Sequence, residues 1–208
     1  VQEVKKKAKE MSMSINEYLC GIYVYSIYKA YMHENPSKKP IVLCVPVNLR
    51  PFFGSVTTRN FFAMVSIPFY PQKEEYDIKE IMLLVQAELK KQITREHLEQ
   101  LICYNVSNQK NLALRAVPLL LKKPVMKIVY LSGVKGTTTT LTNVGMLSVK
   151  EEYRPYIKRF QVILSPSAGQ NMKVTVCSYG DELVVTFGSL LKDTSAQKIF
   201  FENLSREG

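Results

Sequence analysis

Two polar residues, Asn48 and Arg50, follow an apolar run and are the first candidates for chemistry in this chain. Residues 41–47 are almost unbroken apolar, which is typical of a strand buried on both faces of a sheet. An unpaired charge at the end of such a strand is energetically expensive, so Arg50 is expected to have a partner. A second apolar run, 61–69, follows a turn-rich connector. This arrangement is typical of a binding or catalytic site.

The histidines and cysteines show none of the patterns of catalytic or metal sites. His33 and His97 are interpreted as residues of the surface or of a helix face. No two cysteines have the spacing of a zinc or redox motif, and no carboxylate pair suited to acid–base chemistry is visible. We therefore predict buried free thiols in a reducing compartment. The four cysteines are Cys20, Cys44, Cys103 and Cys177.

Composition and charge narrow the class of protein. The chain has 208 residues and 46% hydrophobic residues, as an ordinary globular protein does, with a net charge of +10. That charge suits a phosphate-bearing ligand, a nucleic acid or an anionic surface, but the lysines are scattered, which favours solvated faces. Nucleic-acid binding is not favoured, because interleaved aromatics and clustered lysines are missing. No apolar run is long enough for a membrane span, and residues 1–10 lack a signal peptide's apolar core. We expect a cytoplasmic protein, and a chain that is part of a longer one.

Hydrophobic periodicity predicts helices first, then a change to strands. A capping box at Ser14 and Glu17 predicts the start of a buried helix that runs to about Met32, and Asp77 is placed to cap another. Pro118 and Pro124 must kink or divide the helical segment 112–131. The expected helices are 2–10, 15–32, 77–94, 95–107, 112–131 and 195–204. The expected strands are 41–47, 61–68, 137–142, 160–164, 172–178 and 183–189. Without βαβ alternation, this order predicts an α/β (or α+β) two-layer sandwich with a mixed sheet.

Four segments together resemble the C-terminal half of the chloramphenicol acetyltransferase-like, CoA-dependent acyltransferase superfamily. They are MSINEYL at 13–19, VPVNLRP at 45–51, RNFF at 59–62 and LTNVG at 141–145. The superfamily includes alcohol acetyltransferases and the condensation domains of nonribosomal peptide synthesis, and the alcohol acetyltransferase-like branch is the most similar. The resemblance implies two α/β lobes with the active site in a tunnel between them. Residues 1–208 would then be a single C-terminal lobe.

The resemblance also implies what this chain does not contain. The family's catalytic base is the histidine of an H-x-x-x-D motif in the N-terminal lobe, and neither His33 nor His97 has an aspartate four residues on. The chain alone is therefore expected to be inactive, with the missing N-terminal lobe as its partner. Acyl-CoA would be the co-substrate and an alcohol or amine the acceptor, with no covalently bound cofactor and no metal.

Roles for individual residues follow from the same resemblance. Arg50 would brace the histidine loop by pairing with the motif's aspartate, since a guanidinium fits a carboxylate bidentately; the alternative is a purely local ion pair. Thr142 would donate to the oxyanion of the tetrahedral intermediate; the alternative is a strand residue bonded locally. Asn143, Gly145 and Asn60 would support the site. The function expected is acyl transfer from a thioester, and the alternative is a non-catalytic binding module of the same fold.

Overall fold

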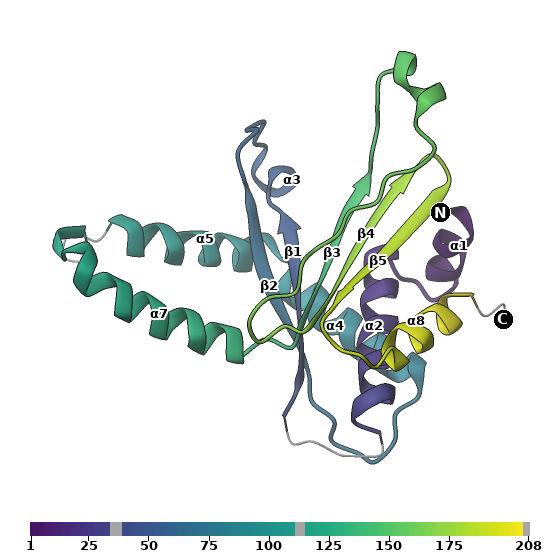
Figure 1. The fold of residues 1–208 in the computed structure, drawn as a ribbon, viewed down its shortest axis with the longest axis horizontal. Helices are drawn as coiled ribbons and strands as arrows, with labels where there is room; N and C mark the ends of the chain where they lie inside the picture. Colours follow the sequence, from purple (N-terminus) through teal and green to yellow (C-terminus); the bar gives the residue numbers. More distant parts are fainter. Residues whose placement is uncertain (34–38, 111–114, 206–208) are drawn as a thin grey trace.

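The computed structural model describes residues 1–33, 39–110 and 115–205. Within these ranges the chain folds into a five-stranded sheet with its main helices packed on one face (Figure 1). Among the helices described, none is long and apolar enough to cross a membrane. The expected two-layer α/β sandwich is confirmed.

The sheet is mixed, with the strand order β2-β1-β3-β4-β5. The central pairs β1–β3 and β3–β4 are parallel, and the outer pairs β1–β2 and β4–β5 are antiparallel. Five of the six predicted strands are confirmed within a few residues. The strands are β1 (Ile41–Asn48), β2 (Phe62–Phe69), β3 (Thr139–Met146), β4 (Met172–Tyr179) and β5 (Glu182–Ser189).

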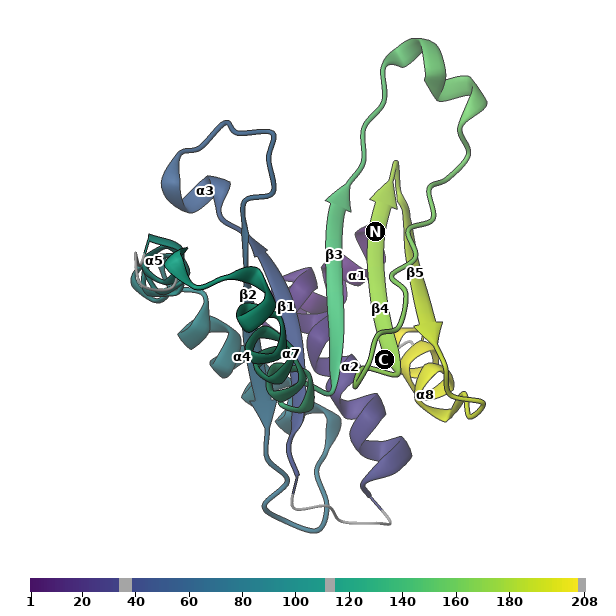
Figure 2. The same cartoon turned by 60° about the vertical axis from the view of Figure 1, so that its left-hand side comes forward.

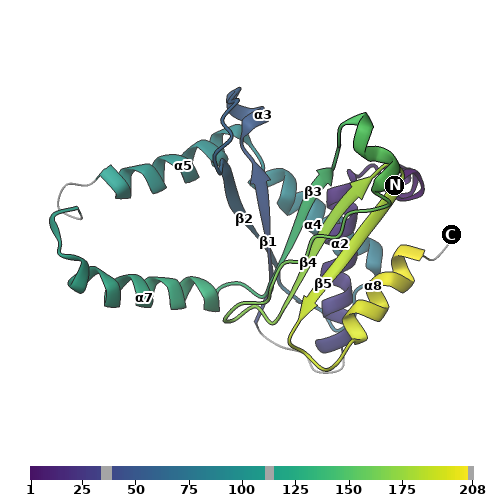
Figure 3. The ribbon, with the colours of Figure 1, turned by 45° about the horizontal axis from the view of Figure 1, so that its top comes forward.

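The helices form a layer behind the sheet and an arm beside it (Figures 1 and 2). Helices α1, α2, α4 and α8 make the layer, and α5 and α7 extend away from the body of the molecule, as Figure 3 also shows. The helices are α1 (Gln2–Glu10), α2 (Ile15–Tyr31), α3 (Arg50–Phe53), α4 (Ile78–Gln92), α5 (Arg95–Lys110), α7 (Leu119–Lys135) and α8 (Ser195–Ser205), with a 3-10 helix η1 (Glu151–Tyr156).

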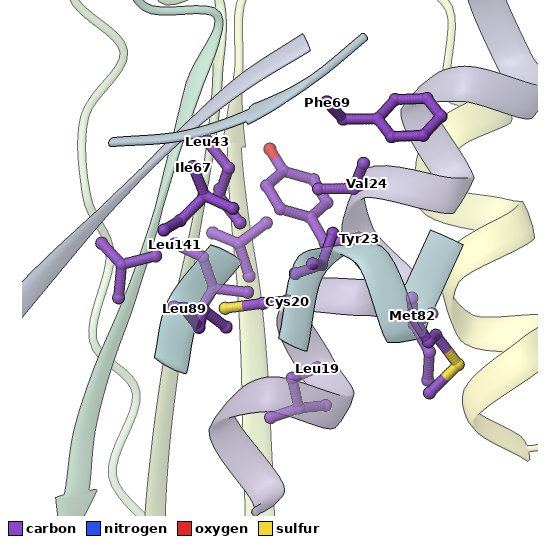
Figure 4. Packing of buried hydrophobic residues seen from close by; sticks show 14 of the residues in the cluster. Leu19, Cys20, Tyr23, Val24, Leu43, Ile67, Phe69, Met82, Leu89 and Leu141 are labelled. Atoms are coloured by element: carbon purple, nitrogen blue, oxygen red, sulfur yellow. The ribbon is translucent and has the colours of Figure 1, made fainter. Parts of the chain in front are cut away.

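Helix α2 is the centre of the core. Its capping box forms as predicted: Ser14 Oγ accepts from Glu17 N at 3.2 Å, and the Glu17 carboxylate accepts from Ser14 N at 2.7 Å. The helix is buried on most sides, because its own apolar residues occur nearly all round it. Figure 4 shows side chains of α2, such as Leu19 and Cys20, packed with α4 and with strand residues such as Leu43.

One core side chain ties the helix layer to the sheet. Tyr23 Oη lies 2.5 Å from Thr139 Oγ1 in β3. Thr139 gives its only hydroxyl proton to Met172 O, at 2.6 Å, so Tyr23 must be the donor. Burial raises the pKa of Tyr23, an effect larger than the opposing one of this bond, so the phenol keeps its proton. The bond therefore fixes α2 to β3 and, through Thr139, to β4.

The structure corrects several sequence-based predictions. Residues 160–164 are not a strand, because the segment lies over β5 without joining the edge of the sheet: Leu164 O lies so close to Gly188 that an added Cβ would clash with it. The apolar period of segment 77–94 predicts that Leu84 is on the buried side of the helix, but Leu84 is 50% exposed on α4. Cys103 is exposed on α5, whereas the other three cysteines are buried as predicted.

The expected break of the segment 112–131 at proline is confirmed at Pro118. That residue precedes α7, whereas Pro124 lies inside α7. Residues 112–114 of the predicted helix lie outside the described residues. Neither α3 nor η1 was expected from the sequence, since short helices leave little periodic signal.

Candidate functional site

The sheet divides at one end because of a proline in β1. Val42 O accepts from Thr138 N at 2.9 Å, so the backbone groups of the even-numbered residues of β1 face β3. Pro46 is one of these residues, and it has no N–H to donate. The pairing of β1 with β3 stops one step earlier, at Cys44 and Thr140, although both strands continue. Beyond Pro46 the sheet is two separate ribbons, β2–β1 and β3–β4–β5.

Thr142 lies at this division. It comes two residues after the last pair of β1 and β3, at the register position of Pro46, and is half-buried. On its other side it pairs with Thr175 of β4. Within the described ranges no hydrogen bond is formed by the Thr142 hydroxyl, so the expected alternative of a locally bonded strand residue is not what the structure shows. The hydroxyl is free to donate to a ligand.

Asn143 and Gly145 shape the strand directly after Thr142. The pairing of β3 with β4 shifts register between these two residues, which marks a β-bulge. Gly145 has φ of 82°, where a side chain would be strained. Asn143 Oδ1 accepts from Gly145 N at 2.9 Å and holds the bulge. Both residues therefore act on the backbone that positions Thr142.

Arg50 is in the first turn of α3, and its guanidinium holds the loop that follows. Its Nε donates to Thr57 O at 2.8 Å and its Nη2 to Arg59 O at 2.6 Å. Its Nη1 donates to Asn48 Oδ1 at 3.1 Å, and the same oxygen accepts from Arg50 N. No carboxylate of the described residues lies within ion-pair distance of it, so a local ion pair does not form. Two of its five N–H groups remain for another partner.

These residues gather at one end of the sheet, where the parallel strands β1 and β3 finish; this end is called the edge of the sheet below. Because β1 and β3 are parallel, their carboxyl ends lie on the same side, where Asn48 and Arg50 follow β1 and Asn143 and Gly145 end β3 (Figure 2). Asn60, which was expected to support the site, is exposed in the loop before β2 and forms no described hydrogen bond. Such an edge, with a divided sheet, is where α/β proteins commonly bind ligands.

The nucleophiles and metal ligands near this edge are unsuited to chemistry of their own. Burial raises the pKa of the Cys44 thiol, an effect that its contact with Ser66 only partly offsets, so the reactive thiolate is disfavoured. No group of three His, Cys, Asp or Glu residues within the described ranges is arranged to hold a metal ion.

Sequence reasoning missed Pro46 and Thr175 beside the division of the sheet, and Gln170 at the opposite, amino-terminal end of β3. Pro46 was visible as a proline inside a buried run, which is a signal for a break in strand pairing. Gln170 connects a loop to β3, since it accepts from Thr140 Oγ1 at 2.9 Å and donates to Thr137 Oγ1 at 2.8 Å. Thr175 is buried beside Thr142. Neither Gln170 nor Thr175 carries a signal in the sequence, because their positions depend on strand register.

No protein-family model matches this chain, and no curated protein matches it. Among solved structures, polyketide synthase associated protein 5 from Mycobacterium tuberculosis is similar, with a TM-score of 0.60 at 13% identity over 98% of this chain and 47% of that one. The wax ester synthase/diacylglycerol acyltransferase from Marinobacter aquaeolei VT8 gives 0.54 at 11% identity, over 98% and 45% of the two chains. The nonribosomal peptide synthetase FmoA3 gives 0.57 at 14%, over 98% and 21%.

This chain therefore shares its fold with a part of each of these three proteins, as the resemblance of its sequence led us to expect. At 11–14% identity the likeness is one of fold. The chain spans about half the length of the first two of these proteins.

Proposed function

We propose that this chain is one lobe of an acyltransferase that moves an acyl group from the thioester of acyl-CoA to an alcohol or amine. The observation that carries the proposal is the unbonded hydroxyl of Thr142 at the division of the sheet, in a fold shared with an enzyme named as an acyltransferase. The net charge of +10 favours a donor that carries phosphates.

The chemistry needs a base and an oxyanion donor. The base takes a proton from the acceptor, whose oxygen or nitrogen adds to the thioester carbonyl carbon. The intermediate carries its negative charge on the carbonyl oxygen, and the Thr142 hydroxyl donates to that oxygen. Collapse of the intermediate breaks the C–S bond, and CoA leaves as a thiol with the proton that the base returns. The described residues supply the donor, and a second lobe supplies the base.

Helix α7 supports the existence of that second lobe. Its large apolar side chains are exposed between residues 119 and 131, including Leu121 (63%), Val125 (58%) and Ile128 (65%). Apolar residues occur all round this helix, which is typical of a helix enclosed by protein. The two unused N–H groups of Arg50 would meet a carboxylate of the same lobe, which is the bracing role expected for this residue.

Acyl transfer by the full-length protein tests the proposal. With acetyl-CoA and 1-butanol, we expect release of the CoA thiol and formation of butyl acetate. Thr142→Val removes the hydroxyl at nearly constant volume and is expected to lower kcat about 100-fold. Thr142→Ser keeps the hydroxyl and is the matched control, with kcat close to that of the parent.

Two results would contradict this assignment in different ways. If Thr142→Val turned over as fast as the parent, Thr142 would not be the oxyanion donor. If the parent bound acyl-CoA but transferred no acyl group to any of a panel of alcohols and amines, the chain would be part of a non-catalytic binding module of this fold.

A further inference from the structure

The hydroxyl of Thr175 is buried and without a hydrogen-bond partner among the described residues. Its side chain is 1% exposed, and Oγ1 is out of reach of solvent. A buried hydroxyl that makes no hydrogen bond costs free energy, so such groups call for a functional or structural reason. Thr175 lies in the middle of β4 and next to the division of the sheet.

The register places Thr175 between two other threonines. It pairs with Thr142 of β3 on one side and with Thr186 of β5 on the other. Directly paired residues project from the same face of a sheet, and neighbouring strands lie about 4.8 Å apart. At this spacing, the rotamers of the two threonines decide whether the hydroxyls of Thr142 and Thr175 meet.

The neighbours of Thr175 on this face already have partners. Cys177, two residues along β4, donates to Phe160 O at 3.5 Å. Thr140, two residues before Thr142 on β3, donates to Gln170 Oε1 at 2.9 Å. Side-chain bonds thus lie on each side of this row, whereas the hydroxyls of Thr142, Thr175 and Thr186 form no hydrogen bond among the described residues. Thr175 has two candidates for a partner, Thr142 and Thr186.

We propose that Thr175 is a positioning residue for Thr142: the Thr175 hydroxyl donates to Thr142 Oγ1, which leaves the Thr142 proton to point at the substrate. A hydroxyl has one proton, so a donor behind Thr142 decides the direction in which Thr142 donates. The same bond polarises the Thr142 hydroxyl and strengthens its donation to an oxyanion. This inference rests on the proposed function, because it deepens the role of Thr142.

The test uses the full-length protein, with acetyl-CoA and 1-butanol as the probes. Thr175→Val removes only the hydroxyl and is expected to lower kcat about tenfold with KM within about twofold, because the loss falls on the transition state. Thr175→Ser restores kcat. Thr186→Val is the matched control on the other side of Thr175 and leaves both constants unchanged. In a Thr142→Val background, Thr175→Val has no further effect.

Three results would overturn the inference: an equal loss in the Thr142→Val background, a Thr175→Ser variant as slow as Thr175→Val, or loss from Thr186→Val alone. A readout that needs no activity separates this inference from the proposed function. The melting temperatures of the parent, of Thr142→Val, of Thr175→Val and of the double variant Thr142→Val/Thr175→Val form a double-mutant cycle. Non-additive shifts support the pair of hydroxyls even if the parent transfers no acyl group, and additive shifts reject it.

Discussion

The bonding of Arg50 is decided by the loop that follows it. The sequence placed a charge at the end of a buried strand and implied a distant carboxylate as its partner. The structure shows the guanidinium bound first to two carbonyl oxygens, those of Thr57 and Arg59. These acceptors belong to the backbone, and nothing in the residue types of the loop announces them.

Arg50→Lys is expected to destabilise the protein by about 1–2 kcal/mol, because a lysine cannot reach both carbonyl oxygens and Asn48 Oδ1 at once. Urea unfolding measures the change. Arg59→Lys is the matched control, because the Arg59 side chain is exposed and makes no described hydrogen bond. Equal stability of the Arg50→Lys variant and the parent would show that these bonds do not hold the loop.

Other residues show which signals the sequence carries. The apolar surroundings of Cys20, Cys44 and Cys177 correctly predicted burial, whereas Cys103 is exposed. Its helix extends away from the body, and local sequence does not encode that direction. In the same way Thr142 stood out by its motif, but its half-burial and free hydroxyl follow from the proline in another strand.

At the scale of elements, chemistry that is local in sequence was the most predictable. Both helix starts with a capping box, at Ser14 and at Asp77, are where the sequence placed them. The segment 160–164 was apolar enough for a strand but does not pair. Instead it lies over the face of β4 and β5, where Cys177 donates to Phe160 O, and does not join the free outer edge of β5.

Gly21 shows how closely two helices of the layer approach. A Cβ at this position would lie 2.7 Å from Met82 Cγ and 3.0 Å from Met82 Cα on α4. The backbone atom cannot move aside as a side chain can. Gly21→Ala is therefore expected to destabilise the protein by about 1–3 kcal/mol through overpacking, measured by urea unfolding.

The matched control is Gly133→Ala in α7, where no atom lies within 4 Å of the added Cβ. This change is expected to stabilise the helix by about 0.5–1 kcal/mol, because alanine is the better helix former. A Gly21→Ala variant that is as stable as the parent would mean that α2 and α4 can separate without cost.

At the scale of the whole molecule, the arm formed by α5 and α7 is the feature that the chain does not explain by itself (Figures 1 and 3). Helix α7 has an exposed apolar stripe at Leu121, Val125 and Ile128. It also carries four lysines and no acidic residue. A second lobe with an acidic rim around an apolar groove would satisfy both properties.

Leu121→Asp is expected to lower the unfolding free energy of the full-length protein by about 3 kcal/mol, because the proposed lobe contact would bury an unpaired carboxylate. Thermal or urea unfolding measures the loss. Leu83→Asp is the control: Leu83 is 54% exposed on α4, in the helix layer behind the sheet. Equal effects of the two variants would mean that α7 does not face a second lobe.

The order of elements was enough to predict the fold at this scale. Helix, two strands, helices, then strands and a closing helix give the mixed sheet with one helix layer. The relation between the two ribbons of the sheet was not predictable in the same way. It depends on which backbone groups of β1 face β3. Pro46 interrupts the pairing because the even-numbered residues of β1 face β3, and a proline at an odd-numbered position would not.

The division at Pro46 also has a mechanical meaning. The two ribbons of the sheet are joined by the short pairing of β1 with β3 at Leu43 and Cys44, and α2 packs behind both ribbons. On α2, the ring of Tyr28 lies 5.9 Å from that of Phe69 in the β2–β1 ribbon. Tyr23, on the same helix, is hydrogen-bonded to Thr139 in the β3–β4–β5 ribbon. Helix α2 therefore holds both parts of the sheet from the covered side, through two tyrosines of its buried face.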